Sequence, residues 1–359
     1  MFRSPLNQLV LALGALALTA CAEDRSPTQP ETGTEPVSAG SLAAALASNT
    51  WTLKAAMPGD LHGISAGVVP DASGQSIVYV TGGTDCCGST QSGILTYKIG
   101  TNTWAGKNPE SPDGEGVEVY NSNGIGRIGN TLYMSGGETY LGGYWHIGGH
   151  LLAYNTATNT LTDKAPPPKL TSEGVTGVID GKLYVLPGRC SGEVYPNPAG
   201  CVSEPIRTLF RYSPTTNFWS WKRPAPHYHP NGAGGVINGK FYVAGGSNDF
   251  SGGPDEASLD RYDPATDTWT TLAPLPIAGA ARGAAIQGKL FVVVRTSTGR
   301  RAFAYDPATN KWTARTAPRY DHDDIVPITW GGKPFLLGVG GLHPHAPLYE
   351  VNATEVYAP

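Results

Sequence analysis

Charged side chains are scarce in this sequence, and no basic stripe is apparent along it. Asp, Glu, Lys and Arg make up 15% of the 359 residues, and the formal net charge is −4. Nucleic-acid-binding domains need a basic patch or stripe to meet the phosphate backbone. The composition therefore argues against a nucleic-acid partner.

The sequence also lacks an apolar run long enough to cross a membrane. Its one candidate, residues 9–20, follows Arg3 and falls short of the roughly 20 residues that a spanning helix needs. A positive start followed by a short apolar stretch is typical of a secretory signal peptide. We therefore expect residues 1–20 to direct export.

The apolar stretch ends in Leu18-Thr19-Ala20-Cys21, which resembles the lipobox of bacterial lipoproteins. The resemblance implies that Cys21 is diacylated and becomes the mature N-terminus in the cell envelope. Ala22 follows instead of Asp, which favours the outer membrane. An ordinary signal peptide with an incidental Cys is the alternative.

Within residues 21–48, the stretch 26–41 is rich in Pro, Thr, Glu and Gly and cannot bury a core. We expect a flexible tether that carries the lipid. The remaining residues, 49–359, are expected to form the folded domain.

Helical periodicity is absent after the first fifty residues, whereas 47 Gly and 30 Pro are interleaved with apolar runs. This pattern favours many short strands joined by turns. The strands repeat: an apolar strand ends in Gly-Gly, a variable loop follows, and a Tyr precedes an aromatic residue by seven positions. These pairs are Tyr97/Trp104, Tyr212/Trp219, Tyr262/Trp269 and Tyr305/Trp312, with Tyr154/Leu161 as a weakened copy. The glycine pairs are Gly82-Gly83, Gly136-Gly137, Gly245-Gly246 and Gly340-Gly341, with Val294-Arg295 at the deviant fifth position.

Successive tyrosines of this repeat lie 43 to 58 residues apart, in the range of a four-stranded propeller blade. The repeat resembles the kelch motif over nearly all of residues 51–359. The resemblance implies an all-β fold, a six-bladed kelch-type β-propeller. The last repeat stops after a third strand, and residues 51–54 look like a fourth strand without a blade. We expect the two to pair and close the ring, which removes exposed edges.

One face of the propeller carries the variable connections, namely those between second and third strands and those between blades. We call it the long-loop face and expect the functional site there. All eight histidines fall in or beside these loops: His62, His146, His150, His227, His229, His322, His343 and His345.

The mouth of the central channel on this face is the expected binding site. Aligning the innermost strands on their Ile or Val endings places Arg282 and Asp324 at equivalent positions of adjacent blades. Two residues earlier in this alignment stand Glu173, Asn231 and His322. Such groups suit a polar or anionic ligand, or acid–base chemistry. An Arg282–Asp324 ion pair that joins two blades is the structural alternative.

Two further sets of residues on this face suggest ligands. Exposed aromatics such as Tyr144 and Trp145 suit stacking on a sugar, and they also pack loops together. The pairs His227/His229 and His343/His345 are weak candidates for a divalent metal, since neither has the spacing of an established zinc motif. No cofactor is otherwise expected.

Four cysteines remain once Cys21 is lipidated: Cys86, Cys87, Cys190 and Cys201. An exported protein is expected to oxidise them. Cys190 and Cys201 share one loop, so we expect them to form a local disulfide. Cys86 and Cys87 then form a vicinal disulfide or stay reduced.

The sequence favours an envelope-anchored, monomeric binding module for a carbohydrate or a protein on the long-loop face. The alternative is an exported enzyme of mutarotase or epimerase type, or a metal-dependent one, because kelch-type propellers include both. The catalytic residues of those families are not matched position by position in this sequence, so none are assigned.

Overall fold

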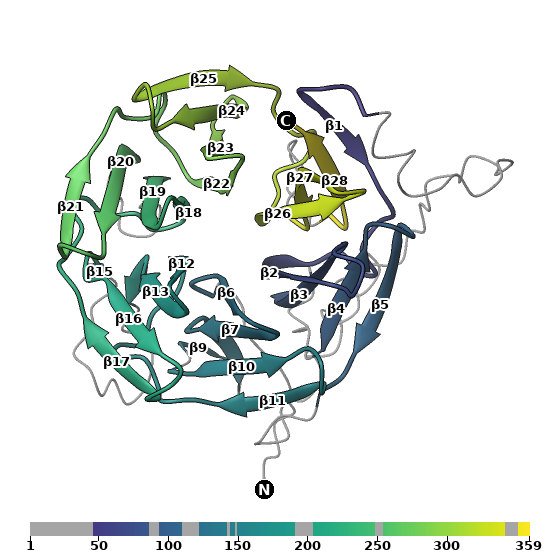
Figure 1. Ribbon diagram of the computed structural model, residues 1–359, viewed down its shortest axis with the longest axis horizontal. Coiled ribbons are helices and arrows are strands. Elements are labelled where there is room, and N and C mark those ends of the chain that lie inside the picture. Colours follow the sequence, from purple (N-terminus) through teal and green to yellow (C-terminus); the bar gives the residue numbers. More distant parts are fainter. Residues whose placement is uncertain are drawn as a thin grey trace, which may run out of the picture. The chain divides into compact units, whose positions relative to one another are not determined.

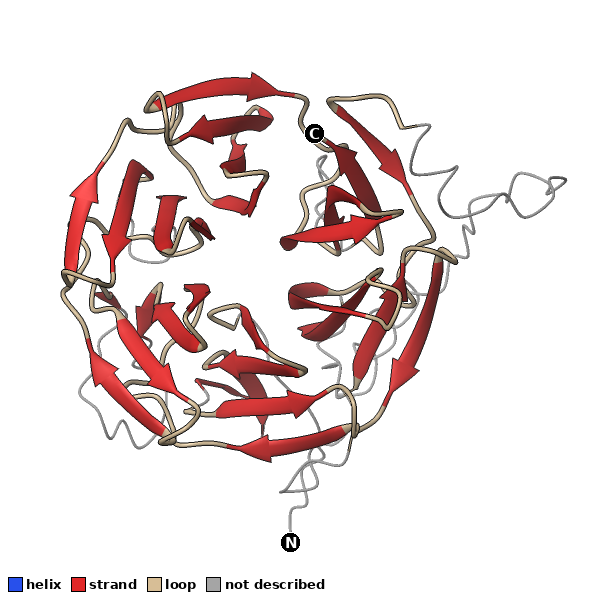
Figure 2. Ribbon diagram, in the orientation of Figure 1, coloured by secondary structure: helices blue, strands red, loops and turns tan. Residues whose placement is uncertain are grey.

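The computed structural model describes residues 46–85, 93–109, 122–141, 144–147, 149–190, 204–247, 254–341 and 351–359. All regular structure in these residues is β-strand (Figure 2). No helix among them is long and apolar enough to cross a membrane. The lipidation site, the signal peptide and most of the tether lie outside the described residues.

Twenty-four of the strands form six antiparallel, four-stranded blades. From the innermost strand outward, blade one contains β2 (His62–Pro70), β3 (Ser76–Thr84), β4 (Ile94–Lys98) and β5 (Thr103–Lys107). Blade two contains β6 (Ile125–Ile128), β7 (Thr131–Ser135), β10 (Leu151–Asn155) and β11 (Thr160–Asp163). Blade three contains β12 (Val175–Ile179), β13 (Lys182–Leu186), β16 (Phe210–Ser213) and β17 (Phe218–Trp221).

The other three blades repeat this order. Blade four contains β18 (Ala233–Ile237), β19 (Lys240–Gly246), β20 (Glu256–Asp263) and β21 (Thr268–Thr271). Blade five contains β22 (Ala281–Ile286), β23 (Lys289–Thr296), β24 (Gly299–Asp306) and β25 (Lys311–Arg315). Blade six contains β26 (Asp324–Trp330), β27 (Lys333–Val339), β28 (Thr354–Ala358) and β1 (Thr50–Leu53).

The predicted all-β, six-bladed propeller is confirmed. The innermost strands stand around a central axis, and the outermost strands run along the rim (Figure 1). Two small hairpins are added in the connections between second and third strands. They are β8 (Glu138–Leu141) with β9 (Tyr144–Ile147), and β14 (Arg189–Cys190) with β15 (Glu204–Pro205).

Closure of the ring by the N-terminal strand is also confirmed. Strand β1 pairs with β28, so that Trp51 lies opposite Tyr357. The indole ring of Trp51 packs 5.1 Å from the Tyr357 ring and 6.2 Å from the Phe291 ring of blade five, measured between centroids. Strand β1 therefore completes blade six and seals its contact with blade five.

A polar clamp joins neighbouring blades at the rim. In each blade the hydroxyl of the buried repeat Tyr donates a hydrogen bond to an Asn or Asp in a left-handed turn. The six acceptors are Asn102, Asn159, Asn217, Asp267, Asn310 and Asn49, at 2.7 to 2.8 Å and with φ between 49° and 58°. Asn tolerates this backbone conformation better than most residues, which explains its recurrence.

In five of the seams the same side chain also binds the preceding blade. Asn310 Oδ1 accepts the N–H of Ala273 at 3.0 Å, while the indole of Trp312 donates to the Ala273 carbonyl at 2.8 Å. One peptide unit is thus held from both sides. Blade two has Leu161 where the indole would be, and no second bond from Asn159 to the preceding blade occurs within the described residues.

Asn310→Ala is therefore expected to lower the free energy of unfolding by about 2 kcal/mol, because it leaves a hydroxyl and an N–H without partners. Asn159→Ala is the matched control, since it loses the Tyr bond alone, and we expect about half that effect. Urea denaturation of both variants measures the difference. Equal losses would show that the second bond of the clamp adds nothing.

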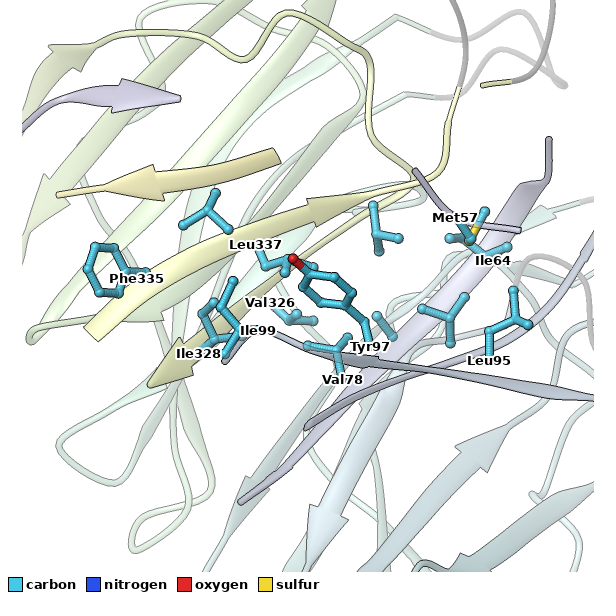
Figure 3. Close-up of a cluster of buried hydrophobic side chains, with 14 of the residues drawn as sticks. Met57, Ile64, Val78, Leu95, Tyr97, Ile99, Val326, Ile328, Phe335 and Leu337 are labelled. Carbon is cyan, nitrogen blue, oxygen red and sulfur yellow. The ribbon is translucent and has the colours of Figure 1, made fainter. Parts of the chain in front are cut away.

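The hydrophobic core lies between the blades rather than within one of them. The largest cluster joins blades six and one, where Leu337 and Val326 face Val78, Leu95 and Tyr97 (Figure 3). The buried side chains of this cluster expose between 0% and 7% of their surface, so solvent is excluded from this contact between blades. Leu46 packs against the same cluster. This packing fixes where each innermost strand places its side chains around the axis.

Candidate functional site

A central cavity of about 390 Å³ lies at the axis and is lined by all six innermost strands. This volume is within the range of small-molecule sites. Strand register places Ser65, Arg282 and Asp324 opposite Thr81, Val293 and Val339, which are equivalent positions of their blades. Arg282 and Asp324 thus lie in register at the cavity, as the alignment of strand endings predicts.

The mouth of this cavity on the long-loop face is a closed ring of hydrogen bonds, one at each of the six seams. In order around the axis they join Ser65 Oγ to Ser122 Oγ (2.6 Å), Thr176 Oγ1 to the Asn123 carbonyl (2.6 Å), the Asn231 N–H to the Glu173 carbonyl (2.8 Å), the Ala281 N–H to the Asn231 carbonyl (2.8 Å), Arg282 Nε to the Asp323 carbonyl (2.6 Å), and the Ala66 N–H to Asp324 Oδ2 (2.8 Å). Much of the predicted site therefore has a structural role.

Most N–H donors of Arg282 form hydrogen bonds with neighbouring blades. Besides the bond from Nε, Nη1 donates to the carbonyls of Asn231 (3.1 Å) and Ala281 (2.9 Å), and Nη2 donates to Asn231 Oδ1 (2.9 Å). A guanidinium has five N–H donors, so one on Nη2 remains for a ligand. The side chain is better suited to fixing the mouth than to gripping an anion.

Asp324 binds blade one and not Arg282. Its Oδ2 accepts from Ala66 and its Oδ1 accepts from the N–H of Ile325 at 2.8 Å. Burial raises the pKa of Asp324, while the N–H of Ala66 and the charge of Arg282 act in the opposite direction. The suggested Arg282–Asp324 ion pair is wrong: the two residues tie different seams, because each reaches the blade beside it.

Two side chains that line the cavity, Asn123 and Asp323, each have a buried oxygen without a hydrogen-bond partner in the described chain, and of the two it is Asp323 that can ionise. The unpartnered oxygen of Asp323 is Oδ2. Burial raises the pKa of this carboxyl to about 7, against the lowering effects of Arg282 and of the N–H groups of Ile64 and Gly63. Asp323 therefore titrates near neutral pH and offers an acceptor to whatever enters.

Glu173 lies at the cavity wall and belongs to a buried charge cluster. Its carboxylate is 2.8 Å from Arg189 Nε, and Arg189 Nη2 also donates to Glu138 Oε1 at 2.9 Å. Burial raises the pKa of Glu173, although the charges of Arg189 and Arg282 lower it. Two carboxylates thus share one arginine, which adds negative charge beside the mouth.

His322 is not at the mouth, contrary to the prediction. Its imidazole is fully buried between Glu355 Oε2 (2.9 Å from Nε2) and the Gly340 carbonyl (3.2 Å from Nδ1). Burial opposes ionisation of Glu355, but the bond and charge of His322 outweigh it and lower the pKa of Glu355. This pair anchors the Gly340 turn.

Blade four repeats this arrangement with His229. Its Nδ1 is 2.7 Å from the Gly245 carbonyl and its Nε2 is 3.2 Å from Asp260 Oδ2, while His227 Nδ1 is 3.0 Å from the same oxygen. No group of three or more His, Cys, Asp or Glu that could hold a metal occurs in the described part of the chain. His227 and His229 are thus committed to Asp260.

The remaining predicted residues are distributed as follows. His62 Nδ1 lies 3.1 Å from the Thr84 carbonyl at the start of β2, and Asn231 borders the cavity with φ of 55°. The side chains of Tyr144 and Trp145, and all of Cys21, Cys86, Cys87, Cys201, His343 and His345, lie outside the described residues.

Cys190 is buried, with 2% of its surface exposed, and it is disulfide-bonded. Its partner is not among the described residues, so the pairing with Cys201 stays a prediction.

Sequence reasoning missed three groups at or beside the mouth. Asp323 is adjacent to a predicted residue, and its unpartnered Oδ2 becomes visible only in the structure. Asn123 donates from its amide to Thr171 Oγ1 at 2.9 Å. Arg189 precedes Cys190 in a loop, and nothing in the sequence signals that it bridges two carboxylates. An acidic residue two positions before the repeat Tyr, as in Asp260 and Glu355, would have identified the buried histidines.

Comparisons with known proteins agree with this fold. Residues 230–276 match the Kelch motif family model. The chain is 26% identical to Kelch repeat and BTB domain-containing protein 12 of Danio rerio, over 58% of this chain and 36% of that protein. It is 31% identical to Kelch-like protein 15 of Danio rerio, over 44% and 28%. The chain thus spans about a third of the length of these relatives.

A solved structure titled "Structure of YjhT" shares the fold. The TM-score is 0.65 at 16% sequence identity, over 84% of this chain and 96% of that one.

Proposed function

We propose that this propeller is a binding module whose central cavity receives a small polyhydroxylated ligand of carbohydrate type from the long-loop face. The observation that carries the proposal is the buried, unpartnered Oδ2 of Asp323 at the mouth. A buried acceptor without a donor is costly, and a ligand hydroxyl would supply one.

The charges at the mouth favour a neutral ligand over an anionic one. Arg282 has most of its donors bonded to blades four to six. Asp323, Asp324 and Glu173 are acceptors, and a carboxylate ligand would meet their charge when they are ionised. Ser65 and Ser122 add hydroxyls that can bind a sugar in either direction.

We infer the anchoring of this module from the sequence alone. The lipobox-like segment at Cys21 supports an envelope protein held by its lipid, with the outer membrane favoured. Protein partners on the long-loop face are the alternative, since many kelch-repeat proteins bind proteins through their propellers.

A glycan screen by isothermal titration calorimetry tests the proposal. We expect neutral sugars to bind better than uronic acids, and Asp323→Asn to weaken binding ten- to a hundredfold, because it removes a charged acceptor. Asp321→Asn is the matched control, since Asp321 pairs with Arg295 and does not line the cavity. A preference for anionic sugars that disappears in Arg282→Gln would contradict the proposal.

Acid–base catalysis is a second candidate, and one observation favours it. The pKa of Asp323, about 7, is matched to proton transfer at neutral pH. If the module interconverts sugar anomers, exchange measured by NMR will show a pH profile that bends near 7 and flattens in Asp323→Asn.

A further inference from the structure

Four arginines gather at the seam between blades five and six. Arg300 and Arg301 lie on β24, Arg315 ends β25, and Arg319 lies in the connection to blade six. We call them the arginine patch. Arg315 lies one position from Arg301 across the sheet, since it pairs with Ala302. Arg301 and Arg319 are exposed, and the other two are half-buried.

No carboxylate neutralises the patch in the described part of the chain. Arg300 Nε donates to the Pro318 carbonyl at 3.0 Å, Arg301 Nη1 to the Arg300 carbonyl at 2.9 Å, and Arg315 Nη1 to the Ala314 carbonyl at 3.0 Å. The neighbouring Arg295 lies 3.6 Å from Asp321. Four positive charges thus share one seam of a chain whose net charge is −4.

Blade five has a short connection on the patch side. Its second and third strands are joined by Ser297 and Thr298 alone, whereas the other blades have longer connections there. The departure from the Gly-Gly repeat at Val294-Arg295 is part of this short hairpin. Arg300 and Arg301 therefore stand directly after a tight turn and have no long loop of their own blade above them.

The N-terminal strand joins the propeller at the same seam. Asn49 Oδ1 accepts the N–H of Thr316 at 3.0 Å, and Trp51 Nε1 donates to the Thr316 carbonyl at 2.9 Å. Thr316 directly follows Arg315, and Figure 1 shows β25 ending beside β1 at the rim. Strand β1 therefore enters the fold beside the patch, while Leu46, three residues before Asn49, packs against the cluster between blades six and one.

We propose that the arginine patch docks on an anionic phospholipid surface next to the lipid anchor and so holds the propeller in one orientation. The orientation rests on the proposed lipidation of Cys21, whereas attraction to anionic lipid does not. Charge complementarity and the entry of the N-terminal strand beside the patch both favour a membrane over a soluble polyanion. Each basic side chain near such a surface strengthens binding several-fold.

Vesicle co-sedimentation of the full chain tests this. The variant Cys21→Ser, which cannot be lipidated, is mixed with vesicles of phosphatidylcholine alone or with 30% phosphatidylglycerol. Binding to the first measures the apolar segment at residues 9–20, and the increase on the second measures the patch. We expect an increase of at least tenfold that vanishes at high salt. Replacing all four arginines with Gln should abolish it.

A matched control removes the same charge elsewhere. Four lysines beside turns on the face opposite the long-loop face are replaced with Gln: Lys98, Lys182, Lys311 and Lys333. This variant should keep the increase. Because Arg300 also bonds Pro318, a triple variant that keeps Arg300 guards against misfolding and should still lose most of it. The proposal is overturned if binding of the Cys21→Ser parent does not depend on phosphatidylglycerol, or if the control and patch variants lose binding equally.

Two arms separate the sources of failure. Metabolic acyl labelling of the wild type, compared with Cys21→Ser, reports on the anchor alone. Lipid on Cys21 without a phosphatidylglycerol effect refutes the patch and keeps the anchor, and the reverse result refutes only the anchor and with it the orientation. Retention on an immobilised polyuronate that needs the four arginines, with no vesicle effect, would assign the patch to an acidic glycan instead.

Discussion

Deleting residues 1–54 is expected to abolish the cooperative thermal unfolding of the propeller or to lower its melting temperature by 10 °C or more. The deletion removes β1, so β28 becomes an unpaired edge. It also removes the Trp51 ring, which packs against both Phe291 and Tyr357. Loss of a fully buried aromatic side chain costs about 3–5 kcal/mol, and the partly buried Trp51 contributes a fraction of that to the 5–15 kcal/mol that holds an ordinary domain together.

A second truncation makes this result specific. Deleting only residues 22–45 keeps Leu46, which packs against the cluster between blades six and one, and Ser48, whose hydroxyl bonds the Pro359 carbonyl. Differential scanning calorimetry should find this form as stable as the full chain. Trp51→Ala should fall between the two. Equal melting temperatures for the two truncations would mean that the ring closes without β1.

The ring and its closure could be predicted because the repeat is recognised from residues close together in the sequence. A Tyr and a Trp seven residues apart fix the third and fourth strands, and Ile or Val endings fix the first. The orphan strand at Trp51 then has one available partner. Strand pairing confirms each of these steps, from Tyr97 opposite Trp104 to Trp51 opposite Tyr357.

The chemistry of the mouth could be predicted only in part, because register does not say which neighbour a side chain reaches. Arg282 and Asp324 are equivalent by position, yet Arg282 binds blades four and six and Asp324 binds blade one. His322 is two residues from Asp324 and is nevertheless buried against Glu355. These choices depend on the twist of each seam, which spacing along the chain does not record.

The arginine patch shows the same limit from the other side. No basic stripe is visible along the sequence, since Arg301 and Arg315 are separated by a turn and Arg319 belongs to the next connection. Cross-strand pairing brings them together. The lack of basic segments still argues against a nucleic-acid partner. It does not argue against contact between a small arginine patch and an anionic phospholipid surface.

Asp323→Asn is expected to stabilise the protein at alkaline pH and to have little effect in acid. The folded pKa of Asp323 is about 7, against an ordinary value of 3.8, because the carboxyl is buried. Between those values the folded protein holds a proton that the unfolded chain has released, so stability falls as pH rises. A pKa difference of about three units lowers the free energy of unfolding by about 4 kcal/mol at pH 8, relative to acid. Asn carries no charge and avoids this loss.

Urea denaturation of wild type and Asp323→Asn at pH 4, 6 and 8 measures the effect as a difference. Glu355 and Asp260 have lowered pKa values, so the stability that they contribute is lost in acid instead. Both residues are present in wild type and variant, so their contributions cancel in the difference. Asp324 and Glu173 cancel in the same way. Asp321→Asn removes a neighbouring charge that is paired with Arg295, and it should show no comparable gain. A difference that is constant with pH would place the pKa of Asp323 in the ordinary range.

The same variant links stability to binding. A buried carboxylate that destabilises the fold above pH 7, with one oxygen unpartnered, is expected at a position where it meets a ligand. Asp323→Asn should therefore gain stability and lose affinity together, and ligand binding to the wild type should raise the melting temperature most where the carboxylate is ionised. If Asp323→Asn becomes more stable and binds the neutral sugars unchanged, the unpartnered oxygen is not the ligand's acceptor. The binding site must then be sought among the outer loops of the long-loop face.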